Sequence, residues 1–267
     1  MFQDFYLRQY ALSPIFCTFK AITWITSAML KKNLFHFFIL LIGFSASAQQ
    51  TDSAYIKDNF TKIERLIPMR DGIKLFTAIY MPKEKTEKHP ILLNRTPYTV
   101  SPYGENNYKT SLGPSPGLLK KGFIFVYQDV RGKWMSEGEF VDVRPHVANK
   151  KGKKAIDESS DTYDTIDWLI KNVKNNNGKV GIYGISYPGF YSTTSLPDAH
   201  PALKAVSPQA PVTDWFLGDD FHHNGAFMLA DAFNFYSTFG VPRPKPITPD
   251  KDPKSFQFPI KDNYRFF

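Results

Sequence analysis

A serine framed by glycines, near the middle of the chain, could act as a nucleophile. Gly184, Ser186 and Gly189 form a G-x-S-Y-x-G pattern between a short apolar run at 180–183 and a segment that predicts a helix. A serine on such a strand-to-helix turn has its hydroxyl lifted clear of the sheet, and side chains at the glycine positions would collide with the backbone. The helix that follows offers free backbone N–H groups where a reacting carbonyl oxygen would gain negative charge. A plain glycine–serine turn is the alternative, and the flanking strand and helix favour the nucleophile.

The elements that must position this serine alternate between strands and helices. Alternating apolar residues predict a hairpin, with strands at 61–69 and 73–81 joined by a turn at Arg70-Asp-Gly72. Apolar runs predict further strands at 90–93, 123–127 and 203–207, and helical spacing predicts helices at 158–173 and 227–239. Residues 99–117 predict a long irregular loop. This order favours an α/β fold with a mostly parallel sheet entered by an antiparallel hairpin.

The first 48 residues predict an export signal. Met29 is followed by two lysines, an apolar run to Phe44 and the small-residue sequence Ala46-Ser-Ala48. This is the order of a secretory signal peptide, with Gln49 as the expected mature start and Met29 as the expected true start. An uncleaved membrane anchor is the alternative, although the apolar run is short for a spanning helix. We therefore expect a periplasmic or secreted protein without stable membrane insertion after cleavage.

Charge and cysteine content narrow the chemistry further. Removing residues 1–48 takes away four Lys or Arg and one Asp, so the net charge falls from +8 to +5. No basic helix or aromatic RNA-binding pattern accompanies this mild positive charge, so we expect no nucleic-acid partner. Cys17 is the only cysteine and lies in the predicted leader, which excludes a disulfide or a cysteine nucleophile in the mature protein. The sequence has no H-E-x-x-H, calcium-loop or phosphate-loop pattern, so we expect no metal and no cofactor.

Five motifs together resemble one enzyme family. They lie at residues 67–72 (IPMRDG), 94–98 (NRTPY), 128–138 (QDVRGKWMSEG), 184–189 (GISYPG) and 219–227 (DDFHHNGAF). In this order they resemble the CocE/NonD serine hydrolases, a group with X-Pro dipeptidyl-peptidase-like α/β-hydrolase domains. The 219–227 string is most similar to the α-amino-acid ester hydrolases, which also acylate β-lactam nuclei. The resemblance covers about residues 58–267 and implies an α/β-hydrolase fold.

The resemblance implies roles for four residues. Ser186 matches the nucleophile, which would attack an ester or amide carbonyl to give an acyl-enzyme. The backbone N–H of Tyr187 and the phenol O–H of Tyr98 match the two oxyanion donors, each worth about 3 kcal/mol of transition-state stabilisation. Asp220 matches a carboxylate of the acidic cluster that holds the substrate's α-ammonium group.

Several residues of these motifs have a structural alternative. Tyr98 could be an aromatic side chain packed at a strand end, with its hydroxyl on a backbone carbonyl. Asp219 and Asp220 could cap a helix beginning near His222. The Asp129/Arg131 pair predicts a buried ion pair that fixes a loop. In the same 128–138 motif, core packing is the default expectation for Trp134 and Met135, with a pocket mouth as the other reading.

The resemblance also implies that part of the family's catalytic machinery lies outside this chain. The family places its triad acid and His, the end of its helical cap and its C-terminal β-sandwich domain beyond residue 267. Asp214, Asp231, His200, His222 and His223 follow Ser186, but none lies in a matching motif. We therefore expect an N-terminal fragment of a longer enzyme, nearly inactive alone. Its expected parts are residues 1–48, the hydrolase domain at 52–240, and a connector or start of the cap at 241–267.

Three functions follow from these observations. The first is a serine esterase or acyl transferase acting on α-amino-acid esters or β-lactam side-chain amides. The second is the same chemistry on X-Pro peptides or simple carboxylic esters. The third is an inactive truncated binding protein that keeps the pocket. In each case the partner is a small ester, amide or peptide, and the full-length parent could form a homo-oligomer.

Overall fold

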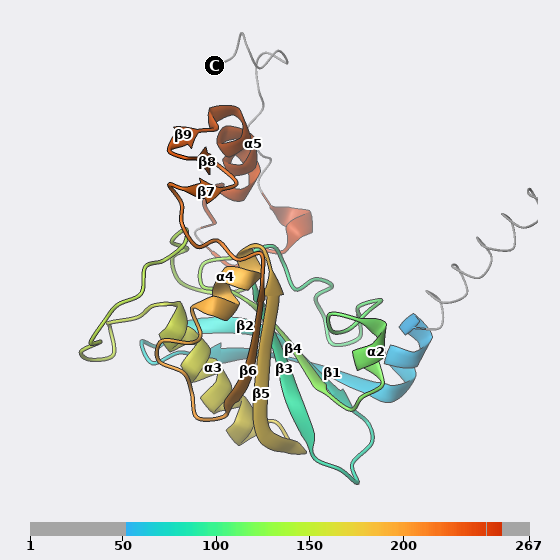
Figure 1. Cartoon of the computed structure of the whole chain (residues 1–267). Coiled ribbons are helices and arrows are strands. Elements are labelled where there is room, and N and C mark those ends of the chain that lie inside the picture. The colour runs from blue at the N-terminus through green and yellow to red at the C-terminus, as the bar shows by residue number, and fades with distance from the viewer. Residues whose placement is uncertain (1–51, 244, 253–267) are drawn as a thin grey trace, which may run out of the picture. The chain divides into compact units, whose positions relative to one another are not determined.

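A computed structural model describes residues 52–243 and 245–252, which contain a six-stranded sheet (Figure 1). The strands lie in the order β1-β2-β4-β3-β5-β6; their bounds are β1 (Phe60–Pro68), β2 (Lys74–Pro82), β3 (His89–Thr96), β4 (Ile124–Asp129), β5 (Asn176–Ile185) and β6 (Leu203–Gln209). β2 pairs antiparallel with β1 and β4, whereas the β3/β4, β3/β5 and β5/β6 pairs are parallel. The predicted α/β fold, with a hairpin leading into a mostly parallel sheet, is confirmed.

The two faces of the sheet bury different sets of side chains. Successive side chains of a strand point to opposite faces, so Leu75 and Ile79 of β2 lie in one apolar cluster and Phe76 and Tyr80 in another. Helix α3 (Glu158–Asn172) covers the first face with Ile166, Leu169 and other apolar residues. The second face is covered by the long loop after β3, which contributes Val100, Leu112 and the short helix α2 (Pro116–Leu119). The irregular loop predicted at 99–117 is therefore part of the core.

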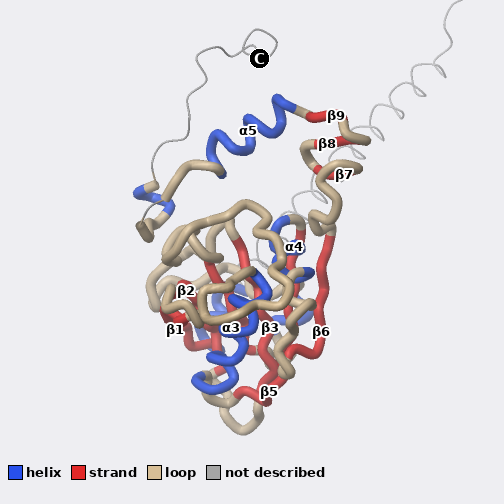
Figure 2. Tube along the Cα trace, turned by 90° about the vertical axis from the view of Figure 1, so that its left-hand side faces the viewer, coloured by secondary structure: helices blue, strands red, loops and turns tan. Residues whose placement is uncertain are grey.

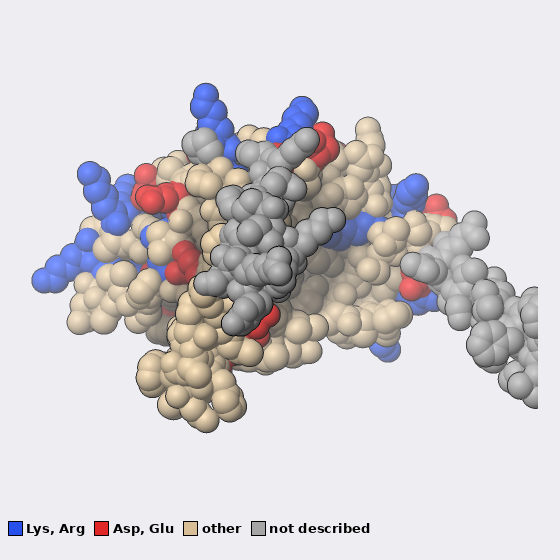
Figure 3. Space-filling view, turned by 90° about the horizontal axis from the view of Figure 1, so that it is seen from above, with Lys and Arg blue, Asp and Glu red and all other residues tan. Residues whose placement is uncertain are grey.

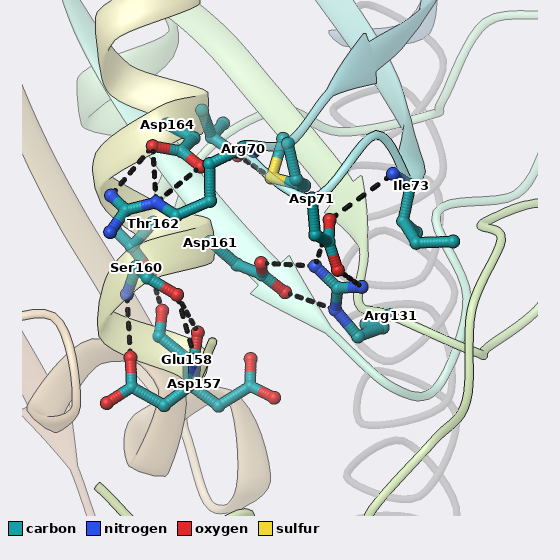
Figure 4. Close-up of polar contacts among 12 residues, drawn as sticks. Arg70, Asp71, Ile73, Arg131, Asp157, Glu158, Ser160, Asp161, Thr162 and Asp164 are labelled. Carbon is teal, nitrogen blue, oxygen red and sulfur yellow. Dashed lines mark hydrogen bonds and ion pairs between the residues drawn. The ribbon is translucent and has the colours of Figure 1, made fainter. Parts of the chain in front are cut away.

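Helix α3 begins where a capping side chain satisfies its first free N–H groups. The Asp157 carboxylate accepts a hydrogen bond of 2.8 Å from the backbone N–H of Ser160, and the Ser160 hydroxyl accepts one of 2.9 Å from the N–H of Asp157 (Figure 4). This reciprocal pair is a capping box. The first turn of α3 carries the acidic residues Glu158 and Asp161.

A smaller set of elements follows β6 and lies beyond the carboxyl ends of the parallel strands, as Figures 1 and 2 both show. The set comprises β7 (Gly218–Asp219), β8 (His222–His223), β9 (Ala226–Phe227), helix α5 (Leu229–Phe239) and a 3-10 turn at Pro249–Lys251. The helix predicted at 227–239 is confirmed. The alternative helix near His222 is wrong, because β7, β8 and β9 pair as a three-stranded antiparallel sheet there.

The predicted signal peptide at 29–48 lies outside the described residues, as do residues 253–267 of the predicted connector. Within residues 52–252, leaving out 244, no helix has the length and apolar character needed to cross a membrane. Seen from above, basic side chains lie along the rim of the face in view, with acidic side chains among them (Figure 3).

Candidate active site

Ser186 lies on a tight turn between β5 and the short helix α4 (Tyr187–Thr193). Its φ of +60° is in the left-handed region, which a non-glycine residue rarely adopts. A Cβ at Gly184 would lie 2.1 Å from the Pro188 carbonyl oxygen, and one at Gly189 would lie 2.6 Å from that of Gln209. Both glycines are therefore required by close backbone approach, which is the steric reason expected for the G-x-S-Y-x-G pattern.

The structure brings Tyr98 to Ser186. The Ser186 side chain forms a hydrogen bond with the Tyr98 phenol, which lowers the pKa of the phenol. Burial has the larger effect, so the phenol pKa is raised overall. Tyr98 follows the end of β3, and its backbone N–H donates to the Thr96 hydroxyl at 3.0 Å. Its ring packs edge-on against Tyr187, with 6.4 Å between ring centres. Tyr98 as a whole residue is 42% exposed, so it is not closed into the core.

The backbone N–H and the side chain of Tyr187 have separate roles. As the first residue of α4, Tyr187 has a backbone N–H without an acceptor inside the helix. Its phenol is buried and donates to the Asp142 carboxylate at 2.6 Å, while accepting from the backbone N–H of Val143 at 2.7 Å. The hydroxyl of Tyr236 in α5 donates to the other Asp142 oxygen. Asp142 thus links α4 and α5; nothing in its sequence context indicated this role.

Asp220 is exposed in the turn between β7 and β8, and its charge contributes to raising the Tyr98 pKa. Ser186 and the charge of Asp220 thus both act on the Tyr98 phenol, while the substrate-binding role of Asp220 stays a prediction. Asp219 is more enclosed, and burial raises the pKa of its carboxyl group, assisted by the charges of Asp220 and Asp142. Neither acid caps a helix at His222, since that residue belongs to β8.

Tyr98 lines one of two cavities beside helix α5, whereas Ser186 and Asp220 are not among the residues that line either. One of about 410 Å³ is lined by Tyr98, Lys133, Trp134, Phe239 and Arg243, among others. A second, of about 510 Å³ and mainly apolar, is lined by residues including Asp142, Trp215, Phe221, His222, Phe227 and Tyr236. Trp134 therefore lines a cavity, whereas Met135 packs against the core cluster behind it. Helix α5 contributes to the lining of both cavities.

Lys133 ties the loop after β4 to the end of α5. Its side chain donates to the Phe239 carbonyl at 2.7 Å and lies 3.7 Å from the centre of the Phe239 ring. Burial, with repulsion from Arg243, lowers the Lys133 pKa to about 7. A cation at a helix C-terminus is stabilising, so this contact helps hold α5 beside Tyr98.

Arg131 does not pair with Asp129, and that prediction is wrong. The guanidinium instead binds Asp71 at 2.7 Å and Asp161 at 2.7 Å (Figure 4). These two carboxylates raise the Arg131 pKa against the opposing effect of burial. Arg131 therefore connects the β1–β2 turn, through Asp71, with helix α3, through Asp161. It is architectural, as predicted, but with different partners.

No histidine contacts the Ser186 hydroxyl within the described part of the chain. His200 accepts from the backbone N–H of Ala202 and lies 3.6 Å from Asp167. His222 and His223 lie in β8, where His222 lines the apolar cavity. The described residues thus bring a serine on a strained turn beside a phenol and a free helix N–H, an arrangement suited to attack on a carbonyl.

Comparisons with known proteins identify the family of this chain. The X-Pro dipeptidyl-peptidase (S15 family) profile matches residues 71–254. A solved α-amino acid ester hydrolase is 38% identical, with a TM-score of 0.65, covering 78% of this chain and 33% of that one. An aminopeptidase from a marine sediment archaeon, Thaumarchaeota archaeon, is 39% identical, with a TM-score of 0.61, covering 68% of this chain and 30% of that one. The cocaine esterase of Rhodococcus sp. (strain MB1 Bresler) is 29% identical over 66% of this chain and 28% of its own length.

The chain spans about a third or less of the length of each of these relatives. The family match itself covers well over half of the chain. It includes Tyr98, the 128–138 motif, Ser186 and Asp220. The chain therefore belongs to the X-Pro dipeptidyl-peptidase (S15) family of serine hydrolases, which confirms the CocE/NonD resemblance of its motifs.

Proposed function

We propose that this chain supplies the nucleophile and the oxyanion donors of a serine hydrolase that acts on α-amino-acid esters or amides. The observation that carries the proposal is the convergence of Ser186, the Tyr98 phenol and the Asp220 charge at the carboxyl end of the sheet. Because the chain spans about a third of its relatives, the activity is proposed for the full-length protein that contains it.

The proposed chemistry is acyl transfer in two steps. The Ser186 oxygen attacks the substrate carbonyl carbon, its proton passing to a base that the family resemblance places beyond residue 267. The carbonyl oxygen becomes negative and is stabilised by the Tyr187 N–H and the Tyr98 O–H. Collapse expels the alcohol or amine, which takes up the proton, and leaves an ester on Ser186. Water, or the amine of another acceptor, then attacks this ester and releases the acyl group.

Tyr98→Phe tests the oxyanion role of the phenol. We expect the rate of Ser186 acylation in the full-length protein to fall by roughly 10²-fold, the usual effect of removing one oxyanion donor. The ring contacts with Tyr187 and Phe239 remain, so thermal stability should stay close to that of the wild type. The measurement is the rate of the acylation burst with an aryl ester. An unchanged rate would assign Tyr98 to packing alone.

Asp220→Asn tests the selection of an amino-bearing acyl group. A carboxylate near the acyl carbonyl attracts a substrate ammonium group, so the variant should raise KM for phenylglycine methyl ester by roughly tenfold or more. KM for phenylacetate methyl ester, which has no amino group, should stay the same. Asp231→Asn, at an exposed position in α5, is the matched control. An equal change for both esters would contradict the proposed selectivity.

A second substrate class also has support. The S15 family is named for X-Pro dipeptidyl-peptidases, and one similar solved structure is named an aminopeptidase. Peptide substrates of such enzymes also carry a free amino group, so a role of Asp220 in binding that group does not distinguish esters from peptides. Comparing kcat/KM for phenylglycine methyl ester and for an X-Pro anilide in the same preparation separates them. A preference for the anilide would move the assignment to peptides.

A further inference from the structure

Asp129 ends β4 and carries a fully buried carboxylate. One oxygen accepts a hydrogen bond of 3.0 Å from the backbone N–H of Val100. The other accepts one of 2.8 Å from the Tyr103 hydroxyl and a longer one of 3.4 Å from the N–H of Met135. Within the described residues no cation lies within ion-pair distance of this group, since Arg131 turns to Asp71 and Asp161.

These donors come from the two loops that flank the oxyanion hole. Val100 and Tyr103 follow Tyr98 in the loop after β3, and Met135 lies in the loop after β4. The second loop also holds the first, because the Trp134 indole donates to the Pro97 carbonyl at 3.0 Å. The Asp129 carboxylate therefore bonds both to the loop that carries Tyr98 and to the loop after β4 that contacts it.

We propose that Asp129 is a positioning residue for the oxyanion hole, and that its ionised carboxylate holds the loop at 97–103 so that the Tyr98 hydroxyl faces Ser186. The inference rests on the proposed function of Tyr98 as an oxyanion donor. Hydrogen bonds to an ionised acceptor are roughly twice as strong as those between neutral groups. The N–H groups of Val100 and Met135 can only donate, so a protonated Asp129 would hold them less firmly.

The charge of Asp129 is set by its surroundings. Burial raises the pKa of its carboxyl group to about 7, while the hydrogen bonds from Tyr103, Met135 and Val100 and the charge of Lys109 oppose that rise. Lys109 lies in the loop after β3, and its own pKa is lowered by burial. Reactivity that depends on the ionised carboxylate should therefore increase as pH rises through neutrality.

Asp129→Asn tests the proposal with two measurements on the full-length protein. Hydrogen exchange of peptides covering residues 97–104 should quicken by about tenfold, the effect of losing one buried hydrogen bond. The rate of Ser186 labelling by a fluorophosphonate is then compared between wild type and variant from about pH 5 to about pH 9. The wild-type to variant ratio should rise with pH, with its midpoint near neutrality. Taking the ratio cancels the titration of the catalytic base.

Two further variants make the result decisive. Tyr103→Phe keeps the carboxylate and removes a hydrogen bond that lowers its pKa, so the midpoint should move to higher pH. If Asp129→Asn does not fold, the ratio of wild-type to Tyr103→Phe labelling carries the test, and it should pass through a maximum above neutrality, where only the wild-type carboxylate is ionised. Tyr108→Phe is the control, because Tyr108 lies in the same loop but its hydroxyl accepts from the backbone N–H of Lys62 in β1 and does not contact Asp129.

A ratio that is constant with pH, or unchanged exchange of residues 97–104 in Asp129→Asn, would overturn the inference. Failure of the proposed function is separate: it would appear as a folded wild-type protein that the fluorophosphonate does not label. In that case the hydrogen exchange still decides whether Asp129 holds the Tyr98 loop.

Discussion

Ser186→Ala will abolish covalent labelling of the full-length protein by a fluorophosphonate probe. The probe reacts only with an activated nucleophile, and alanine has no oxygen to react. The turn itself should persist, because Gly184 and Gly189 allow the close backbone contacts that form it. Labelling is measured by mass spectrometry of the intact protein, together with thermal denaturation to show that the variant is folded.

Ser207→Ala is the matched control for that experiment. Ser207 lies in β6 directly opposite Tyr183 of the strand that leads to the turn, and its side chain is exposed. Labelling of this variant should equal that of the wild type. Retained labelling in Ser186→Ala would assign the reactive group elsewhere. A folded wild-type protein that takes no label would instead favour the reading of a binding protein that keeps the pocket.

Arg95→Leu will cost about 3–5 kcal/mol of unfolding free energy, the usual effect of breaking a buried ion pair by removing one partner. Arg95 is fully buried and donates to Gln128 at 2.8 Å and to the Thr162 hydroxyl at 2.8 Å. It also forms an ion pair of 3.2 Å with Glu158, which is itself buried. Leucine would leave the Glu158 carboxylate without its nearest cation.

The pH dependence of that loss has a defined sign. Burial already raises the Glu158 pKa above its usual value, and Arg95 opposes the rise. Without Arg95 the pKa of Glu158 in the folded state rises further, so between its unfolded and folded pKa values the folded state binds more protons than the unfolded state. Stability then falls as pH increases through this range. Urea denaturation at acidic and at alkaline pH should show the larger deficit at alkaline pH.

Arg65→Leu is the matched control for Arg95. Arg65 forms an ion pair of 2.9 Å with Glu105, and both side chains are about half exposed. Pairs of this kind contribute about 1 kcal/mol or less. A loss of similar size in both variants would show that the buried position of Arg95 has no special energetic importance.

Much of the fold could be predicted because its signals are local. Period-two apolar patterns marked β1 and β2, and continuous apolar runs marked the parallel strands, since each strand has to bury its own residues. Helix α3 was predicted in the same way, from apolar residues at helical spacing. The small sheet at 218–227 was missed, because two-residue strands carry no periodicity. Its form is decided by pairing with neighbouring residues.

The partners of the buried charges could not be predicted. Arg131 and Asp129 are two residues apart and opposite in charge, which favoured a local ion pair. In the structure Arg131 turns toward Asp71 and Asp161, and Asp129 turns toward the loop after β3. Which carboxylate reaches a guanidinium depends on how β1, β2 and α3 pack, and local spacing does not contain that information.

The sequence by itself determined the family of this protein, and it contained the candidate nucleophile, the two glycines that its turn requires and the phenol that follows β3. These are local or motif-borne properties, because a strained turn needs particular residues at adjacent positions. Only the tertiary structure decided what holds these residues in place. The Asp142 contacts with Tyr187 and Tyr236, the hydrogen bonds of Asp129 to the Tyr98 loop and the cavities lined by α5 join residues far apart in the chain. Buried polar groups take whichever partners the packed backbone brings within hydrogen-bond distance.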